Sequence, residues 1–154
     1  MIREAVPEDF QAIVRLYRQL HPSDPILEDG AARRAFDTIL QTEGLHLLVL
    51  EVQGAMAATT YVNIIPNLTR SASPYAVIPY AVIENVVVDE TLRGTGLGKQ
   101  IMAASLQKAW DAGCYKAMLL TGSRTPSTHA FYRACGFSGD AKTAYLARPS
   151  HEPS

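Results

Sequence analysis

Asn85-Val86-Val87-Val88-Asp89-Glu90-Thr91-Leu92-Arg93-Gly94-Thr95-Gly96-Leu97-Gly98-Lys99 is the stretch of this chain that decides its fold. Its three valines predict a buried strand, and the three glycines at alternate positions lead into a helix. Backbone N–H groups at the start of a helix have no partner inside the helix, and the helix dipole adds partial positive charge there. Glycines leave room for a large anion beside those groups. The stretch therefore predicts a phosphate or pyrophosphate site between a strand and a helix.

Two well-known phosphate loops do not fit this stretch. A Walker A loop needs Gly, four residues and then Gly-Lys-Ser/Thr, but Arg93 stands at the first glycine and Gln100 follows Lys99. A dinucleotide fingerprint needs G-x-G-x-x-G after the first strand of the domain, and here the motif lies in the middle of the chain with Lys99 in place of the third glycine. Neither spacing explains the loop.

The segment from Arg93 to Gly98 matches the pattern Arg/Gln-x-x-Gly-x-Gly/Ala, which resembles the acetyl-CoA site of the GCN5-related N-acetyltransferases (GNAT). A second segment, His129-Ala130-Phe131-Tyr132-Arg133-Ala134-Cys135-Gly136-Phe137, is similar to the C-terminal motif of that family. The two motifs stand in the family's order. The resemblance covers residues 1–148, is specific at these two segments, and looks most like small-molecule members such as the glucosamine-6-phosphate N-acetyltransferases.

The resemblance implies the fold and the reaction. We expect an α/β (α+β) single-domain GNAT-like fold over residues 1–148, with a central mixed, mostly antiparallel sheet flanked by about four helices, and a disordered tail at 149–154. It also implies acetyl-CoA as the co-substrate and the primary amine of a small molecule as the acceptor, which attacks directly in a ternary complex.

Cofactor contacts are implied in the same way. The backbone of residues 86–88 would pair with the pantetheine arm like an added strand, and the N–H groups of residues 94–99 would wrap the pyrophosphate. Arg93 and Lys99 either screen phosphate charge or lie in solvent. Thr125 stands seven residues before Tyr132, where many relatives have a cofactor-contacting Asn. The expected cofactor residues are Val86, Val87, Val88, Arg93, Gly94, Thr95, Gly96, Leu97, Gly98, Lys99 and Thr125.

Glu84 and Tyr132 are the candidate catalytic residues. Strand alternation predicts that Glu84, Val86 and Val88 share one face. A carboxylate inside an apolar strand is costly unless it has a role. We expect Glu84 to accept a proton from the substrate ammonium, directly or through water, with a pKa raised by burial; the alternative is a strand-end position in water or beside an Arg. By resemblance Tyr132 faces the thioester sulfur as general acid, the alternative being a half-buried core residue.

Composition narrows the possible partners. The chain has 154 residues, 47% of them hydrophobic, and a net charge of −1, which is typical of a soluble globular domain and argues against nucleic acid as a partner. Met1–Ala5 is too polar for a signal peptide, and no apolar run is long enough to span a membrane. Cys114 and Cys135 show no metal-ligand spacing. We expect a cytoplasmic protein without a metal, and by resemblance a homodimer.

The remaining pattern predicts the elements around the motifs. Apolar residues recur at spacings of three and four in the first helix, and Pro-rich residues 66–80 form a loop between two strands. Ser127 or Thr125 would cap the last helix, with Gly136 following its end. The expected strands are residues 2–5, 45–51, 55–65, 81–88, 116–121 and 144–148, and the expected helices are 7–20, 30–41, 98–112 and 127–135.

Two other functions compete with the leading one. The first is protein or peptide N-terminal acetylation, which needs an open groove that the residue 66–80 loop would narrow. The second is a non-catalytic acyl-CoA-binding sensor, because a fold does not fix a function. Arg70 in the loop either binds an anionic substrate group or is solvated. His129 is expected on a helix surface rather than in catalysis.

Overall fold

The computed structural model describes residues 1–25, 30–67 and 78–150 of the chain. These residues fall into two compact units, Met1–Leu119 and Leu120–Ser154. The single domain over residues 1–148 therefore stays a prediction. The expected disordered tail at 149–154 falls mostly on residues outside the described ranges.

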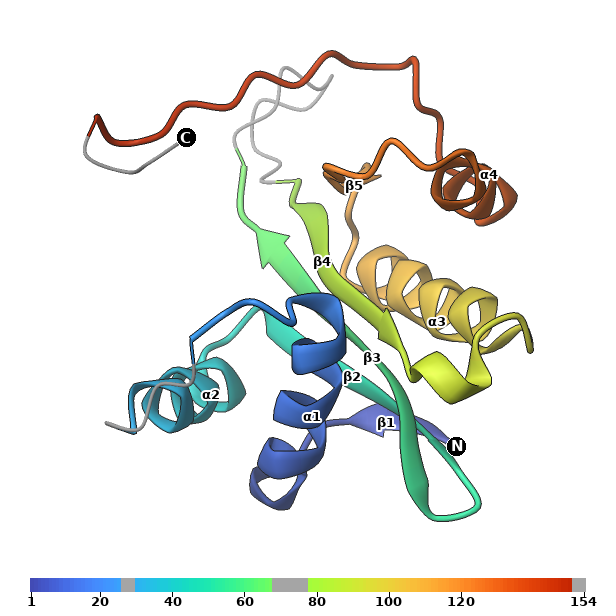
Figure 1. The fold of residues 1–154 in the computed structure, drawn as a ribbon. Coiled ribbons are helices and arrows are strands. Elements are labelled where there is room, and N and C mark those ends of the chain that lie inside the picture. Colours follow the sequence, from blue (N-terminus) through green and yellow to red (C-terminus); the bar gives the residue numbers. More distant parts are fainter. Residues whose placement is uncertain (26–29, 68–77, 151–154) are drawn as a thin grey trace. The chain divides into compact units, whose positions relative to one another are not determined.

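A five-stranded sheet forms the centre of the first unit, with its strands in sequence order (Figure 1). Strands β1 to β4 pair antiparallel, and β5 pairs parallel with β4. The predicted mixed, mostly antiparallel sheet is confirmed. The strands are β1 (Ile2–Glu4), β2 (Leu45–Val52), β3 (Ala55–Ile65), β4 (Tyr80–Val88) and β5 (Ala117–Met118).

Helices cover both faces of this sheet (Figure 1). The short helix η1 (Pro7–Asp9) leads into α1 (Phe10–Leu20), which lies with α2 (Ala31–Gln41) on one face. On the other face lies α3 (Leu97–Asp111), which follows the short helix η2 (Glu90–Leu92). No helix within the described ranges is long and apolar enough to cross a membrane.

Each face of the sheet has its own core. On the α1 side, Ile13 and Leu16 pack with Phe36, Val49 and Val87. Ile13 and Leu16 stand three residues apart, which places both on one side of α1. On the α3 side, the core contains Leu50, Ala57, Ala58 and Ile101. The two cores hold β4 and both of its neighbouring helices at fixed positions on the sheet.

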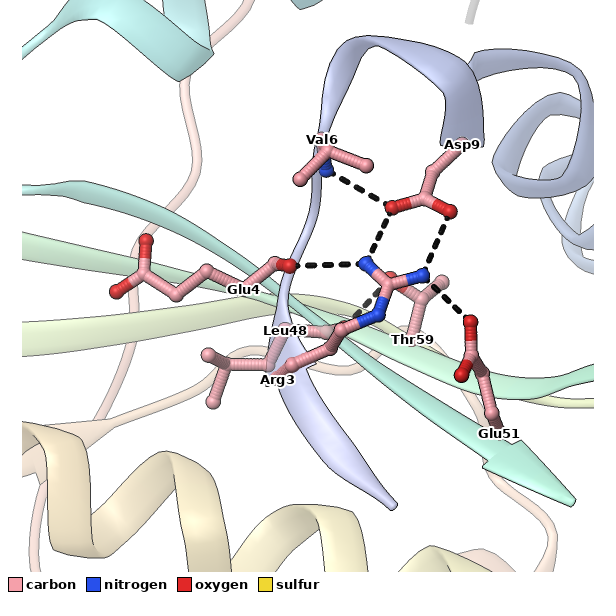
Figure 2. A network of polar contacts seen from close by, with 7 residues as sticks. All are labelled: Arg3, Glu4, Val6, Asp9, Leu48, Glu51 and Thr59. Carbon is pink, nitrogen blue, oxygen red and sulfur yellow. Dashed lines mark hydrogen bonds and ion pairs between the residues drawn. The ribbon is translucent and has the colours of Figure 1, made fainter.

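An ion network fixes the start of the chain (Figure 2). The Arg3 guanidinium donates from Nη1 to Asp9 Oδ2 at 2.6 Å and from Nη2 to Asp9 Oδ1 at 3.0 Å. Its Nη2 also donates to Glu51 Oε1 at 2.5 Å, and Asp9 accepts the Val6 N–H at 2.8 Å. This network joins β1, the first turn of helix and β2, and it holds the pKa of Asp9 below its ordinary value.

The pairing of β3 with β4 contains a β-bulge. Tyr61 pairs with Glu84, and Thr59 pairs with Val87. These partners are two residues apart on β3 but three residues apart on β4, so β4 has one extra residue. Asn85, inside the bulge, has φ = +50°, a left-handed conformation that Asn tolerates better than most residues. Directly opposed residues share a face, so Glu84 and Val87 lie on the face of Tyr61. The expected alternation that grouped Glu84 with Val88 is wrong, because one extra residue reverses it.

The second unit contains α4 (Pro126–Ala134), close to the predicted helix. Thr125 is the residue before its first turn, but its side chain makes no capping hydrogen bond. Gly136 has φ = +94° and follows the helix end as predicted. The predicted strand at 144–148 is wrong: those residues form no strand, and Tyr145 and Leu146 are exposed. A strand forms only where a neighbour accepts its backbone hydrogen bonds.

Candidate active site

The loop between β4 and α3 presents a row of free backbone donors. Within the described part of the chain, the N–H groups of residues 93–99 donate no hydrogen bond, and the first donor of the helix is Gln100, to Gly96 O at 3.2 Å. Gly94 and Gly96 have φ = +78° and +87°. A Cβ built on either glycine meets nothing within 4 Å. Donors and open space together fit an anion that the helix dipole also attracts.

Side chains around this loop leave the donors uncovered. Arg93 and Lys99 are exposed, and Arg93 Nε donates to Val88 O at 3.4 Å. Leu97 packs its side chain against the core on the α3 side, away from the donors. The Thr95 hydroxyl donates to Leu92 O and braces the turn. The predicted residues from Arg93 to Lys99 thus lie together at one helix end.

The edge of β4 that faces β5 is mostly unpaired in the first unit. β5 pairs only with Ala81 and Val82, and it is two residues long instead of the six predicted. Among the described residues, no strand of the unit pairs with this edge from Ile83 to Val88. Residues 86–88 therefore have a free strand edge beside the anion loop, which is where an extended ligand arm adds as a strand.

Glu84 lies at the bulge beside two tyrosines. It is exposed, so the burial that was expected to make it a stronger base is absent. The pKa of Tyr17 of α1 is raised to about 12, chiefly by burial; a hydrogen bond with Asn85 opposes this rise, and the charges of Tyr61 and Glu84 add to it. Burial, and to a smaller extent the charge of Glu84, raises the pKa of Tyr61. A carboxylate, an amide and two phenols therefore lie close together at the bulge, and both phenols are protonated at neutral pH.

In the second unit, Tyr132 contacts two aromatic rings. Its ring centroid is 5.2 Å from that of Phe131 and 6.3 Å from that of Phe137, the second in an edge-on arrangement. Burial, and to a smaller extent Cys135, raises the pKa of the Tyr132 hydroxyl. The hydroxyl therefore stays protonated at neutral pH, as a general acid requires. Both Phe131 and Tyr132 are half-buried.

His129 and Thr125 of the same unit have structural contacts. The His129 Nε2 donates to Ser123 O at 2.8 Å; its non-catalytic role stays a prediction. The Thr125 carbonyl accepts the N–H groups of Thr128 at 3.1 Å and His129 at 3.4 Å. A contact between Thr125 and a cofactor stays a prediction. Arg70 lies outside the described residues, as does most of the predicted 66–80 loop.

Sequence reasoning missed Tyr17 and misplaced Asn85. Tyr17 fits the apolar spacing of the first helix, and nothing in the sequence indicates that its hydroxyl reaches the bulge. Strand alternation places Asn85 on the face opposite Glu84, yet its amide contacts Tyr17 on the α1 side. An Asn inside a valine-rich strand is the one available signal, because Asn accepts a left-handed backbone.

Comparison with known proteins agrees with this geometry. Residues 10–137 match the sequence model described as the acetyltransferase (GNAT) family. A putative acetyltransferase from Agrobacterium tumefaciens str. C58 has a solved structure with a TM-score of 0.88 and 42% identity, covering 97% of this chain and 99% of that one. Glucosamine 6-phosphate N-acetyltransferase 1 of Oryza sativa subsp. japonica is 31% identical over 125 residues, which are 79% of this chain and 70% of the rice protein. Aminoglycoside N(6')-acetyltransferase type 1 of Stenotrophomonas maltophilia is 26% identical over 99% of this chain and 95% of its own length.

Proposed function

Because this chain belongs to the acetyltransferase (GNAT) family and is an acetyltransferase, we propose that it transfers the acetyl group of acetyl-CoA to the primary amine of a small molecule. The observation that supports the proposal is the row of free N–H groups at residues 93–99. Two glycines within this row have open space where a Cβ would lie. A diphosphate fits such a row of donors.

Two further features of the first unit support acetyl-CoA as the co-substrate. The free edge of β4 next to the loop suits the amides of a pantetheine arm. Backbone donors at the same edge would polarise a carbonyl placed there. When bound, acetyl-CoA supplies the acetyl group as a thioester. Residues 86–88 would hold the arm, and residues 93–99 would hold the diphosphate.

Glu84 and Tyr132 are proposed as base and acid. An amine attacks only as the neutral form, so a carboxylate must take its proton, directly or through water. Glu84 is exposed at the bulge and carries two tyrosines beside it, a setting that suits an ammonium group. Tyr132 would give its proton to the departing sulfur, and the raised pKa of its hydroxyl keeps that proton available at neutral pH.

A small acceptor is favoured by the named relatives. The rice and Stenotrophomonas proteins are named for glucosamine 6-phosphate, an amino sugar, and for aminoglycosides, which contain amino sugars. Their shared chemistry is a primary amine on a polar ring. We extend this class to the present chain, with Arg70 as the proposed contact for an anionic group. A cytoplasmic location and a homodimer are proposed with it.

The test is a screen of small amines with acetyl-CoA that records free thiol release. Turnover with an amino sugar, and a loss on the order of 10²-fold or more in Glu84→Gln or Tyr132→Phe, is the expected result. Glu43→Gln and Tyr145→Phe serve as matched controls at exposed positions. CoA binding without any turnover would instead identify a sensor, and turnover only with peptide N-termini would identify the peptide-acetylating alternative.

A further inference from the structure

We propose that Asp89, held by Arg15 and Gln19 of α1, is a positioning residue that sets the donor loop at residues 93–99 and thereby the affinity for the diphosphate of the acetyl donor. The inference rests on the proposed function, because it concerns the same loop. It assigns a role in cofactor binding to three side chains outside both sequence motifs.

Asp89 uses both oxygens of its carboxylate. It is the first residue after β4 and is only 8% exposed. Its Oδ1 accepts the Thr91 N–H at 3.0 Å and the Thr91 hydroxyl at 2.7 Å. Its Oδ2 accepts hydrogen bonds from Arg15 Nη1 and, at 3.5 Å, from Gln19 Nε2. A buried carboxylate needs partners of this kind to offset its desolvation.

The two residues of α1 that contact Asp89 also contact the segments beside it. Arg15 and Gln19 stand four residues apart, on one side of the helix. Arg15 Nη2 donates to Met56 O on β3 at 2.9 Å, and Gln19 Oε1 accepts the Glu90 N–H at 2.8 Å. One helix therefore fixes the end of β4, the start of η2 and the start of β3 relative to one another.

A chain of hydrogen bonds leads from Asp89 to the donor loop. The Asp89 N–H donates to Ala57 O at 2.8 Å, and the Asp89 carbonyl accepts the Leu92 N–H at 2.8 Å. The Leu92 carbonyl in turn accepts the Thr95 hydroxyl, and Gly96 follows. A shift of Asp89 would move this turn and the N–H groups within it. Displacements well under the length of a hydrogen bond are enough to weaken a multi-donor site.

The two oxygens of Asp89 allow its local and its long-range roles to be separated. Asn in place of Asp89 keeps one oxygen, which can still accept the Thr91 N–H and close the turn. It lacks the second acceptor and the charge that hold Arg15 and Gln19. Asp89→Asn therefore tests the link to α1 while leaving the local turn with its acceptor.

The experiment compares two acetyl donors in the full chain. For CoA, we expect Asp89→Asn and Arg15→Gln to raise the Kd on the order of tenfold, measured by calorimetry. For S-acetylpantetheine, which lacks the diphosphate, we expect kcat/KM to stay within about twofold of the unsubstituted protein. Arg15→Lys should recover part of the affinity because it keeps the charge. Arg18→Gln, at an exposed position of the same helix, should keep the original Kd.

The possible outcomes separate this inference from the proposed function. If the unsubstituted protein binds no CoA, the proposed function fails. If it binds CoA and the variants bind equally well, only the positioning role of Asp89 fails. An equal loss with both donors would show general damage and would also overturn it. If Asp89→Asn does not fold, Gln19→Ala removes the acceptor of the Glu90 N–H and one donor to Asp89 while leaving Asp89 and Arg15 in place, and it undergoes the same comparison.

Discussion

Replacing Gly96 by Val should separate the strain of the loop from its use as a binding site. Gly96 has φ = +87°, and a Cβ there meets nothing within 4 Å. The cost to the free protein therefore comes from the backbone and is about 1–2 kcal/mol. For a chain of this size that lowers Tm by roughly 2–8 °C. The protein should remain folded at the temperature of a binding assay.

The effect on CoA should be larger than this strain suggests. A Val side chain would occupy the space in front of the donors and remove at least one hydrogen bond to a charged phosphate, which contributes about 1.5–3 kcal/mol. The Kd for CoA should rise on the order of ten- to a hundredfold. Isothermal titration at 10 °C, well below the lowered Tm, measures this directly.

Gly113→Val is the matched control. Gly113 has φ = +81° and equally open space, but it follows the other end of α3, a helix of 15 residues and thus about 22 Å long. Its backbone strain should match that of Gly96→Val, whereas its affinity for CoA should be unchanged. Equal affinities of the two variants would refute the assignment of the loop as a diphosphate site.

Three other predictions concern stability and the second unit. Because Arg3 holds the pKa of Asp9 low, the stabilisation from their ion pair is complete above about pH 4 and is lost as pH falls through the folded-state pKa. Asp9→Asn should therefore lower the urea midpoint more at pH 7 than at pH 3. An equal decrease at both pH values would contradict this. Leu16→Ala, at a fully buried position, should cost about 2–5 kcal/mol, whereas Leu20→Ala on the same helix, 37% exposed, should cost below about 1 kcal/mol; both are read from urea unfolding. His129→Ala should leave the pH profile of turnover unchanged, and a lost ionisation would give His129 a catalytic role.

Local patterns in the sequence predicted most of the fold. Apolar spacing located α1, and the three valines located the end of β4, because each pattern reports a face that must be buried. The same reasoning failed for residues 144–148 and overestimated β5. A run such as Ala144–Arg148 has strand-like composition, but a strand exists only with a partner, and pairing between distant segments leaves no mark in one sequence.

The candidate site divides in the same way. The glycines indicated the turns of the donor loop, because glycine readily adopts the positive φ seen at Gly94 and Gly96; the use of the loop as a diphosphate site stays a prediction. The carboxylate of Asp89 was not singled out, because its partners Arg15 and Gln19 lie 74 and 70 residues earlier in the chain. The position of Glu84 in strand β4 was predicted, but its neighbours were not, because the extra residue at Asn85 depends on the pairing with β3.

That extra residue also affects how this strand can be compared with relatives. In a relative whose β4 lacks the extra residue, the residue at the equivalent position beyond the bulge points to the opposite layer of helices. An alignment written without a gap at Asn85 would then match Val87 and Val88 with residues from the wrong sides. Loss of one codon at this point would likewise exchange the environments of all residues beyond it, even though every remaining amino acid is the same.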